Sequence, residues 1–303
     1  MEGLFIHSFL RSIGFSSIRR KTDLEKVLGT VMTTPGKQVY VQSPLDPTRQ
    51  LCEKSMDFSE NIGISVIGEY DSNNFFHVTH YFPYLRGNRI TVRTDVAVNH
   101  RVDSDAYTGM CSDYRFGTSL IFYLQNSLDY LRNAEGGDHS TITGCPITLT
   151  ALASSGKILL PIKKTPALLK IALAERSKYE ILAKAAHIGS EDAITDLTMR
   201  ELDTYAMINR RIKTEDVYSI VESTFIPYGS ESDNYTILGT ILDVQHKVNS
   251  ITNEAVTELY ITCNGLSLLI CINDADLLGE ARPGRRFKGN IWLQGYLDFE
   301  KIY

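Results

Sequence analysis

A strict two-residue alternation runs from Ile90 to Asn99, and this pattern constrains the fold. Ile90, Val92, Thr94, Val96 and Val98 form one set, and the residues between them form the other. A period of two over ten residues is typical of a strand with one buried face. Further strands are predicted at residues 62–66, 75–84 and 107–116. The short polar turns between them favour an antiparallel sheet.

Helical spacing of apolar residues flanks this β region on both sides. A short helical hairpin is predicted at the start of the chain, within residues 4–34, and another helix is predicted at residues 117–132. Residues 147–162 are expected to form a β-hairpin around Ser154-Ser155-Gly156. Together these elements predict an α+β domain over residues 1–164.

The next segment is helical throughout. Thr165 can cap a helix whose first position is Pro166, and Gly189 is a natural stop for that helix. Two further helical segments follow before Pro227. We therefore predict a helical connector over residues 165–227, with packing on the first domain as one arrangement, and a polar linker over residues 228–234.

The C-terminal residues 235–303 are expected to form a small β-barrel. Asn264-Gly265 between two apolar strands is a strong hairpin signal, because both residues tolerate positive φ. The last strand, within residues 284–299, carries Gly289 and Gly295, which let a long strand bend as barrel closure requires. Three strands, a short helical link and a bent final strand are OB-like, and an SH3-like barrel is the alternative.

One face of that last strand is the candidate ligand-binding surface. Lys288, Trp292 and Tyr296 alternate on it, and Arg285 and Arg286 lie just before it. OB-folds bind single-stranded nucleic acid by stacking bases on aromatic side chains beside basic groups. The alternatives are that the aromatic residues pack under the N-terminal domain and that the arginines belong to a solvated turn.

Composition narrows the classes of protein. The chain has 31 Lys and Arg against 36 Asp and Glu, a net charge of −5, and 43% hydrophobic residues. These values exclude a disordered chain and a basic DNA-coating protein. No apolar run approaches the roughly 20 residues of a membrane span. The five cysteines form no C-x-x-C motif, and free buried thiols in a reducing cytoplasm are expected.

The sequence contains no recognisable motif for a catalytic residue, a cofactor or a metal site, and none is predicted. Neither a P-loop nor a G-x-G-x-x-G motif is present. The enzymatic alternative is a metal-dependent hydrolase that uses the loose cluster of Asp95, His100, Asp103 and Asp105. This alternative requires the four side chains to converge in a pocket.

Three stretches carry a family resemblance: HSFLRSIGFSSI near the start, MRELDTYAMINRRIKTEDVYSIVESTFIPYG before the linker, and CINDADLLGEARPGRRFKGNIWLQGYLDF near the end. Together they resemble an uncharacterised family from anaerobic Gram-positive bacteria of the clostridial group, known only as a domain of unknown function. The resemblance implies a bacterial cytoplasmic protein. It implies no activity, cofactor or catalytic residue.

The function expected from the sequence is that of a non-enzymatic cytoplasmic binding or adaptor protein that acts through the C-terminal barrel. A protein partner is favoured over nucleic acid, because the excess of acidic residues weakens non-specific binding to phosphates. The alternatives are the metal-dependent hydrolase and a purely structural subunit of an oligomer. The oligomeric state stays open.

Overall fold

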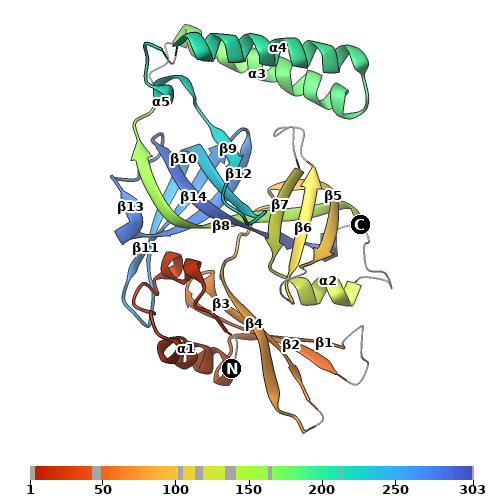
Figure 1. Cartoon of the computed structure of the whole chain (residues 1–303), viewed down its shortest axis with the longest axis vertical. Helices are drawn as coiled ribbons and strands as arrows, with labels where there is room; N and C mark the ends of the chain where they lie inside the picture. Colours follow the sequence, from red (N-terminus) through yellow and green to blue (C-terminus); the bar gives the residue numbers. More distant parts are fainter. Residues whose placement is uncertain are drawn as a thin grey trace.

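The computed structural model describes residues 4–42, 49–71, 73–101, 105–112, 119–133, 141–162, 166–211 and 213–301, without the side chains at 166–173, 176 and 201. Figure 1 shows three parts along the long axis of the molecule. A small sheet with a helix lies at one end, a large sheet lies in the middle, and two long helices lie at the other end. The mixed α and β composition expected from the sequence is confirmed.

The small sheet is antiparallel and follows the order of the chain. Its strands are β1 (Lys37–Gln42), β2 (Gln50–Ser59), β3 (Ile62–Tyr70) and β4 (Phe76–Leu85). The 3-10 helix η1 (Ser8–Ile13) and α1 (Lys21–Thr33) precede it. Leu24, Leu28 and Val31 are buried, and their spacing of four and three places them on the side of α1 that packs against β2 and β3. The strands predicted at residues 62–66 and 75–84 are confirmed.

The large sheet has ten strands in the described part of the chain. They are β5 (Val92–His100), β6 (Tyr107–Ser112), β7 (Ser119–Leu124), β8 (Thr141–Leu159), β9 (Thr224–Pro227), β10 (Asn234–Val248), β11 (Ala255–Cys263), β12 (Leu266–Asn273), β13 (Leu277–Leu278) and β14 (Arg286–Leu297). The alternation from residue 90 therefore does form a strand, β5. Met110 and its neighbours in β6 match the strand predicted from residue 107, whose last residues, 113–116, lie outside the described ranges.

Two long strands, β8 and β14, pair with each other and take part in two rings of strands. One ring runs β10, β11, β12, β8 and β14, and it closes because β14 also pairs with β10. The other runs β5, β6, β7, β14 and β8, and it closes because β8 also pairs with β5. Apolar side chains inside both rings form one continuous core. We call the first ring the barrel. It combines β10, β11, β12 and β14 with β8, which the sequence had placed in the first domain.

Two local predictions in this region are wrong. The predicted helix at residues 117–132 is instead β7 followed by the short helix α2 (Ser127–Asn133). The predicted hairpin around Ser154 to Gly156 is instead uninterrupted strand, because β8 pairs with neighbours on both sides along this stretch. The Asn264-Gly265 hairpin is confirmed, and both residues have positive φ, 50° and 85°.

The helical connector forms an arm at the end of the molecule farthest from α1 (Figure 1). It consists of the antiparallel helices α3 (Pro166–His187) and α4 (Glu191–Arg211), followed by the short helix α5 (Val217–Ile220). The predicted cap Thr165 lies outside the described residues. None of the helices in the described ranges combines the length and the apolar composition of a membrane span. The two remaining 3-10 turns are η2 (Asp274–Asp276) and η3 (Phe299–Lys301).

Candidate functional site

Trp292 is buried rather than presented to a ligand. It is 5% exposed, and its Nε1 donates a hydrogen bond to Asp233 Oδ2 at 2.9 Å. The rings of His7 and Phe9 cover it, with centroids 4.6 and 5.6 Å away. In this arrangement no base can stack on Trp292. The aromatic face of β14 is therefore a packing surface for the start of the chain, which was the sequence alternative.

The Arg286 side chain forms hydrogen bonds to the chain before and after the two long helices of the arm. Its guanidinium donates to the carbonyl oxygens of Leu160 at 3.0 Å, Val221 at 2.9 Å and Tyr218 at 2.7 Å. Leu160 directly follows β8, and the other two carbonyls belong to α5 and the residue after it. Arg286 is 5% exposed, and burial lowers its pKa. This side chain is buried against backbone carbonyls and is not presented to a phosphate in solution.

Lys288 and Arg285 are engaged as well. Lys288 Nζ donates to the Tyr218 hydroxyl and lies 4.6 Å from the centre of that ring. This hydrogen bond lowers the pKa of Tyr218. Arg285 Nη1 donates to the Glu280 carbonyl at 2.7 Å and lies 3.4 Å from its carboxylate. The basic residues at the start of β14 thus contact α5, and Arg285 contacts the preceding turn.

Tyr296, the last candidate on this strand, is half-buried beside a small cavity between the two sheets. Burial raises its pKa. The cavity of about 20 Å³ also contacts Glu53 and Arg86. Burial raises the pKa of Glu53, whose carboxylate accepts a hydrogen bond from Ser65 at 2.6 Å. A space of this size holds one water molecule and no larger ligand.

The residues of the hydrolase alternative do not form a metal site where they are described. Asp95 lies in the middle of β5 and His100 at its end, about 16 Å apart along the strand. Asp95 Oδ1 accepts from the Gly144 amide at 2.8 Å, and the His100 ring packs against Tyr107. Asp105 is described, whereas Asp103 lies outside the described residues. Within the described ranges, no three His, Cys, Asp or Glu side chains are placed to share a metal ion.

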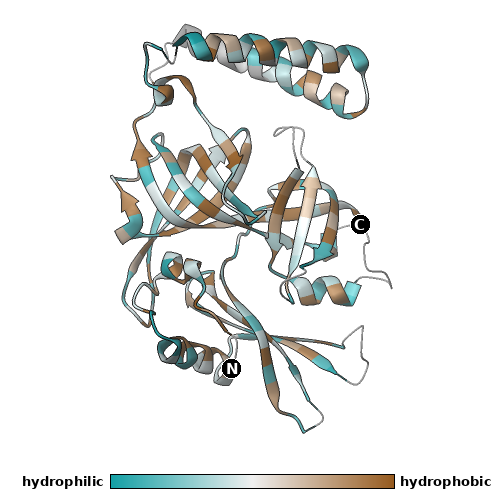
Figure 2. Cartoon of the chain, viewed as in Figure 1, coloured by the Kyte–Doolittle hydropathy of each residue, from teal (hydrophilic) through white to brown (hydrophobic). Residues whose placement is uncertain are grey.

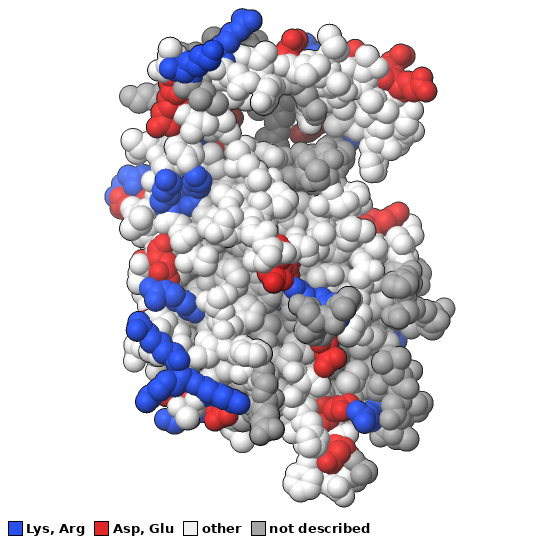
Figure 3. Space-filling view, viewed as in Figure 1, with Lys and Arg blue, Asp and Glu red and all other residues white. Residues whose placement is uncertain are grey.

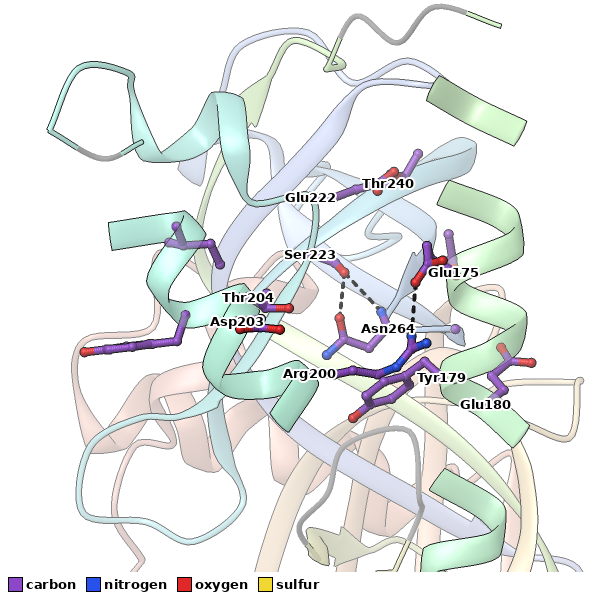
Figure 4. A pocket seen from close by; sticks show the side chains of 14 residues that line it. Glu175, Tyr179, Glu180, Arg200, Asp203, Thr204, Glu222, Ser223, Thr240 and Asn264 are labelled. Carbon is purple, nitrogen blue, oxygen red and sulfur yellow. Dashed lines mark hydrogen bonds and ion pairs between the residues drawn. The ribbon is translucent and has the colours of Figure 1, made fainter. Parts of the chain in front are cut away.

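A large concave surface lies elsewhere, between the arm and one end of the barrel. We call it the hollow (Figure 4). Its volume is about 970 Å³, at the upper end of the range for ligand pockets. The helices contribute Glu175, Tyr179, Glu180, Arg200, Asp203, Thr204, Tyr205 and Ile208, and the segment after α5 and the barrel contribute Glu222, Ser223, Thr240, Thr262, Asn264 and Gly265.

Local hydrogen bonds fix the walls of the hollow. Ser223 Oγ donates to Asn264 Oδ1 at 2.6 Å, and the backbone N–H of Asn264 donates to Ser223 Oγ at 3.4 Å. These bonds tie the chain that returns from the arm to the turn between β11 and β12. Across the hollow, Arg200 Nη1 lies 3.0 Å from Glu175 Oε2 and so joins α4 to α3. Figure 4 shows both sets of bonds as dashed lines.

Carboxylates dominate the charges that line the hollow. Among the described residues, Glu175, Glu180, Asp203 and Glu222 line it, together with one guanidinium, that of Arg200. Hydrogen bonding to Lys178, reinforced by Arg200, lowers the pKa of Glu175, so this carboxylate stays ionised at neutral pH. Threonine and serine hydroxyls on the barrel side add further acceptors. The lining is therefore suited to a cationic group with several N–H donors.

The arm itself has an unusual surface. Of its described side chains in α3 and α4, only Ala183 and Ala193 are buried. Figure 2 shows apolar residues along its exposed sides. The large exposed ones are Ile181, Ile194, Met199, Leu202, Tyr205 and Met207. The sequence predicted this segment only as a helical connector, with packing on the first domain as one arrangement, and did not identify its exposed apolar residues as a candidate binding surface.

Comparison with known proteins gives a family and no activity. No curated protein and no solved structure matches the chain. One family model matches residues 10–295, and it is described as "Domain of unknown function, E. rectale Gene description (DUF3881)". The family expected from the three stretches of sequence is thereby confirmed. Since the match spans nearly the whole sequence, the chain belongs to the DUF3881 family.

Proposed function

We propose that this protein is a non-enzymatic cytoplasmic adaptor that binds a basic segment of a protein partner in the hollow. The observation that carries the proposal is the acidic lining of a large open concavity between the arm and the barrel. An extended peptide with Lys or Arg side chains would place N–H donors against carboxylates and hydroxyls on two walls. Nucleic acid is disfavoured, because phosphates would face the same carboxylates.

The scaffold supports binding rather than covalent chemistry. All five cysteines are free and buried, as expected from the sequence, and burial raises the pKa of Cys145 to about 11 and of Cys263 to about 12. These thiols are therefore poor nucleophiles. The ring of β10, β11, β12, β8 and β14 is the part that we propose to be OB-like. It contributes its end to the hollow, through Thr240 and Thr262, rather than its Trp292 face.

The test is a selection of random peptides on the immobilised full chain, followed by fluorescence anisotropy with the selected peptides. We expect enrichment of Lys and Arg, and loss of binding in Asp203→Arg, which reverses a charge in the hollow. The matched control is Asp196→Arg, which makes the same change on the same helix outside the hollow. Selection of acidic or apolar peptides, or equal binding by both variants, would refute the proposal.

A further inference from the structure

We propose that the outer side of α4 is a self-association surface, on which a second copy of this chain docks antiparallel. This surface differs from the hollow, and the inference does not depend on the proposed function. It rests on three observations: a heptad-spaced stripe centred on Met199 and Leu202, the exposure of these two side chains, and a charge pattern that is complementary to itself when the helix is reversed.

The stripe has the spacing of a helix-pairing seam. Thr195, Met199, Leu202, Ala206 and Asn209 follow one another at intervals of four, three, four and three, which is the heptad pattern of paired helices. Leu202 lies nine residues after the buried Ala193, and at about 100° per residue this places it on the opposite side of the helix. The seam therefore points away from α3.

The side chains of the seam lack cover. Met199 and Leu202 are each 59% exposed, and Ile194 beside the seam is 47% exposed. Scattered apolar residues on a surface need no explanation, but three that line one side of one helix favour an interface. The arm lies at the edge of the molecule, so nothing in the described chain blocks the approach of a second helix (Figure 1).

The charges at the two ends of α4 indicate that the partner bound on the seam is a second copy of this chain. The first turn of α4 is acidic, with Glu191 and Asp192, and its last turn is basic, with Arg210 and Arg211. Figure 3 shows acidic side chains at the turn end of the arm, and basic side chains with acidic ones beside them at the end nearer α5. Asp192 and Arg210 are 18 residues apart, which is five turns, so they lie on the same flank of the seam.

These positions fit a two-fold axis close to Leu202, because the midpoint of Asp192 and Arg210 is residue 201 and the midpoint of Met199 and Ala206 lies between residues 202 and 203. Antiparallel pairing then brings Met199 close to the small Ala206 of the other copy, and Asp192 of each copy close to Arg210 of the other. Neither Asp192 nor Arg210 has an ion pair with the rest of the described chain. A contact confined to one pair of helices is smaller than a standard interface, so we expect a weak dimer in the micromolar range.

The experiment is sedimentation velocity on the full chain from micromolar to submillimolar concentration. We expect a concentration-dependent dimer that Leu202→Glu abolishes by placing two carboxylates at the axis. Asp192→Arg and Arg210→Asp should each raise the dimer dissociation constant by about tenfold or more, because each sets like charges opposite each other. Arg211→Asp is the matched control and should leave the constant unchanged, because Arg211 lies nine residues after Leu202 and so on the opposite side of α4.

A mixture of the two charge variants gives a more specific test than either variant alone. In an equimolar mixture of Asp192→Arg and Arg210→Asp, the heterodimer regains opposite charges at both contacts between position 192 of one copy and position 210 of the other, so association should return to the wild-type level. A monomer at every concentration would overturn the inference. So would a dimer that Leu202→Glu leaves intact, or a pair of charge variants that do not rescue each other, since only antiparallel two-fold pairing of α4 predicts that rescue.

Discussion

Replacement of Arg286 by methionine tests whether this side chain anchors the arm. The guanidinium donates three hydrogen bonds to backbone carbonyls, two of them in α5 and the residue after it. A hydrogen bond that involves a charged group contributes about 1.5–3 kcal/mol. Water can replace the bond to Leu160, whose side chain is 73% exposed, and removal of a buried charge offsets part of the loss. We therefore expect a net loss of about 3 kcal/mol.

The loss should be local, because α5 buries no side chain of its own. Its amides at Ser219 and Val221 are hydrogen-bonded to Asp216 and Val217. Hydrogen exchange of these amides should accelerate by about a hundredfold, while amides of β14 and β8 keep their protection. Arg285→Met, which removes only contacts to Glu280, is the control. Unchanged exchange in α5 would refute the assignment of Arg286 as the anchor.

Two further predictions concern stability. Burial lowers the pKa of His7 and of His80 to about 4 from the ordinary 6.5, so between these values the unfolded chain binds protons that the folded chain does not. The free energy of unfolding should therefore keep its full value above pH 6.5 and fall by up to about 3 kcal/mol per histidine as the pH drops to 4. Urea denaturation should show a smaller fall with pH in the double variant His7→Asn/His80→Asn. An identical fall would contradict the assignment to these histidines. A Cβ on Gly295 would lie 2.3 Å from the Phe122 ring, whereas one on Gly29 in α1 would meet no atom within 4 Å. Gly295→Ala should therefore lower the free energy of unfolding by about 1–3 kcal/mol and Gly29→Ala should raise it by about 0.5–1 kcal/mol, and equal effects would show that the close approach is not needed.

Residues with one buried face were predictable, and residues buried on both faces were not. The alternation from Ile90 to Asn99 became β5, and the Asn264-Gly265 turn formed as expected. The apolar run of β7 has no alternation, so its spacing fits a helix as well as a strand. Gly156 suggested a turn, but it lies inside β8, where a Cβ would come within 2.3 Å of the Phe287 ring. This glycine serves close packing rather than chain reversal.

The hollow could not be predicted from the sequence, for a different reason. The hollow joins residues of α3 and α4 to Ser223 and to the turn at Asn264, and no local pattern announces contacts between segments so far apart. The aromatic and basic pattern of β14 was real, but its partners are His7 and Phe9 for Trp292 and the carbonyls of the arm for Arg286. Pattern identifies which side chains need partners, and only tertiary structure identifies those partners.

The two proposals concern opposite sides of one helix and together predict avidity. A pair of helices that buries only Ala183 and Ala193 among its described side chains gains little stability from its own packing. Pairing through the seam of α4 would supply apolar burial and would join two hollows in one particle. A peptide with two basic segments on a flexible linker should then bind more tightly than a single segment, because the second contact is intramolecular. Leu202→Glu should remove this gain in anisotropy titrations while leaving the affinity for the single segment unchanged. A loss of both affinities would mean that the seam supports the hollow itself, and the two surfaces would not be independent.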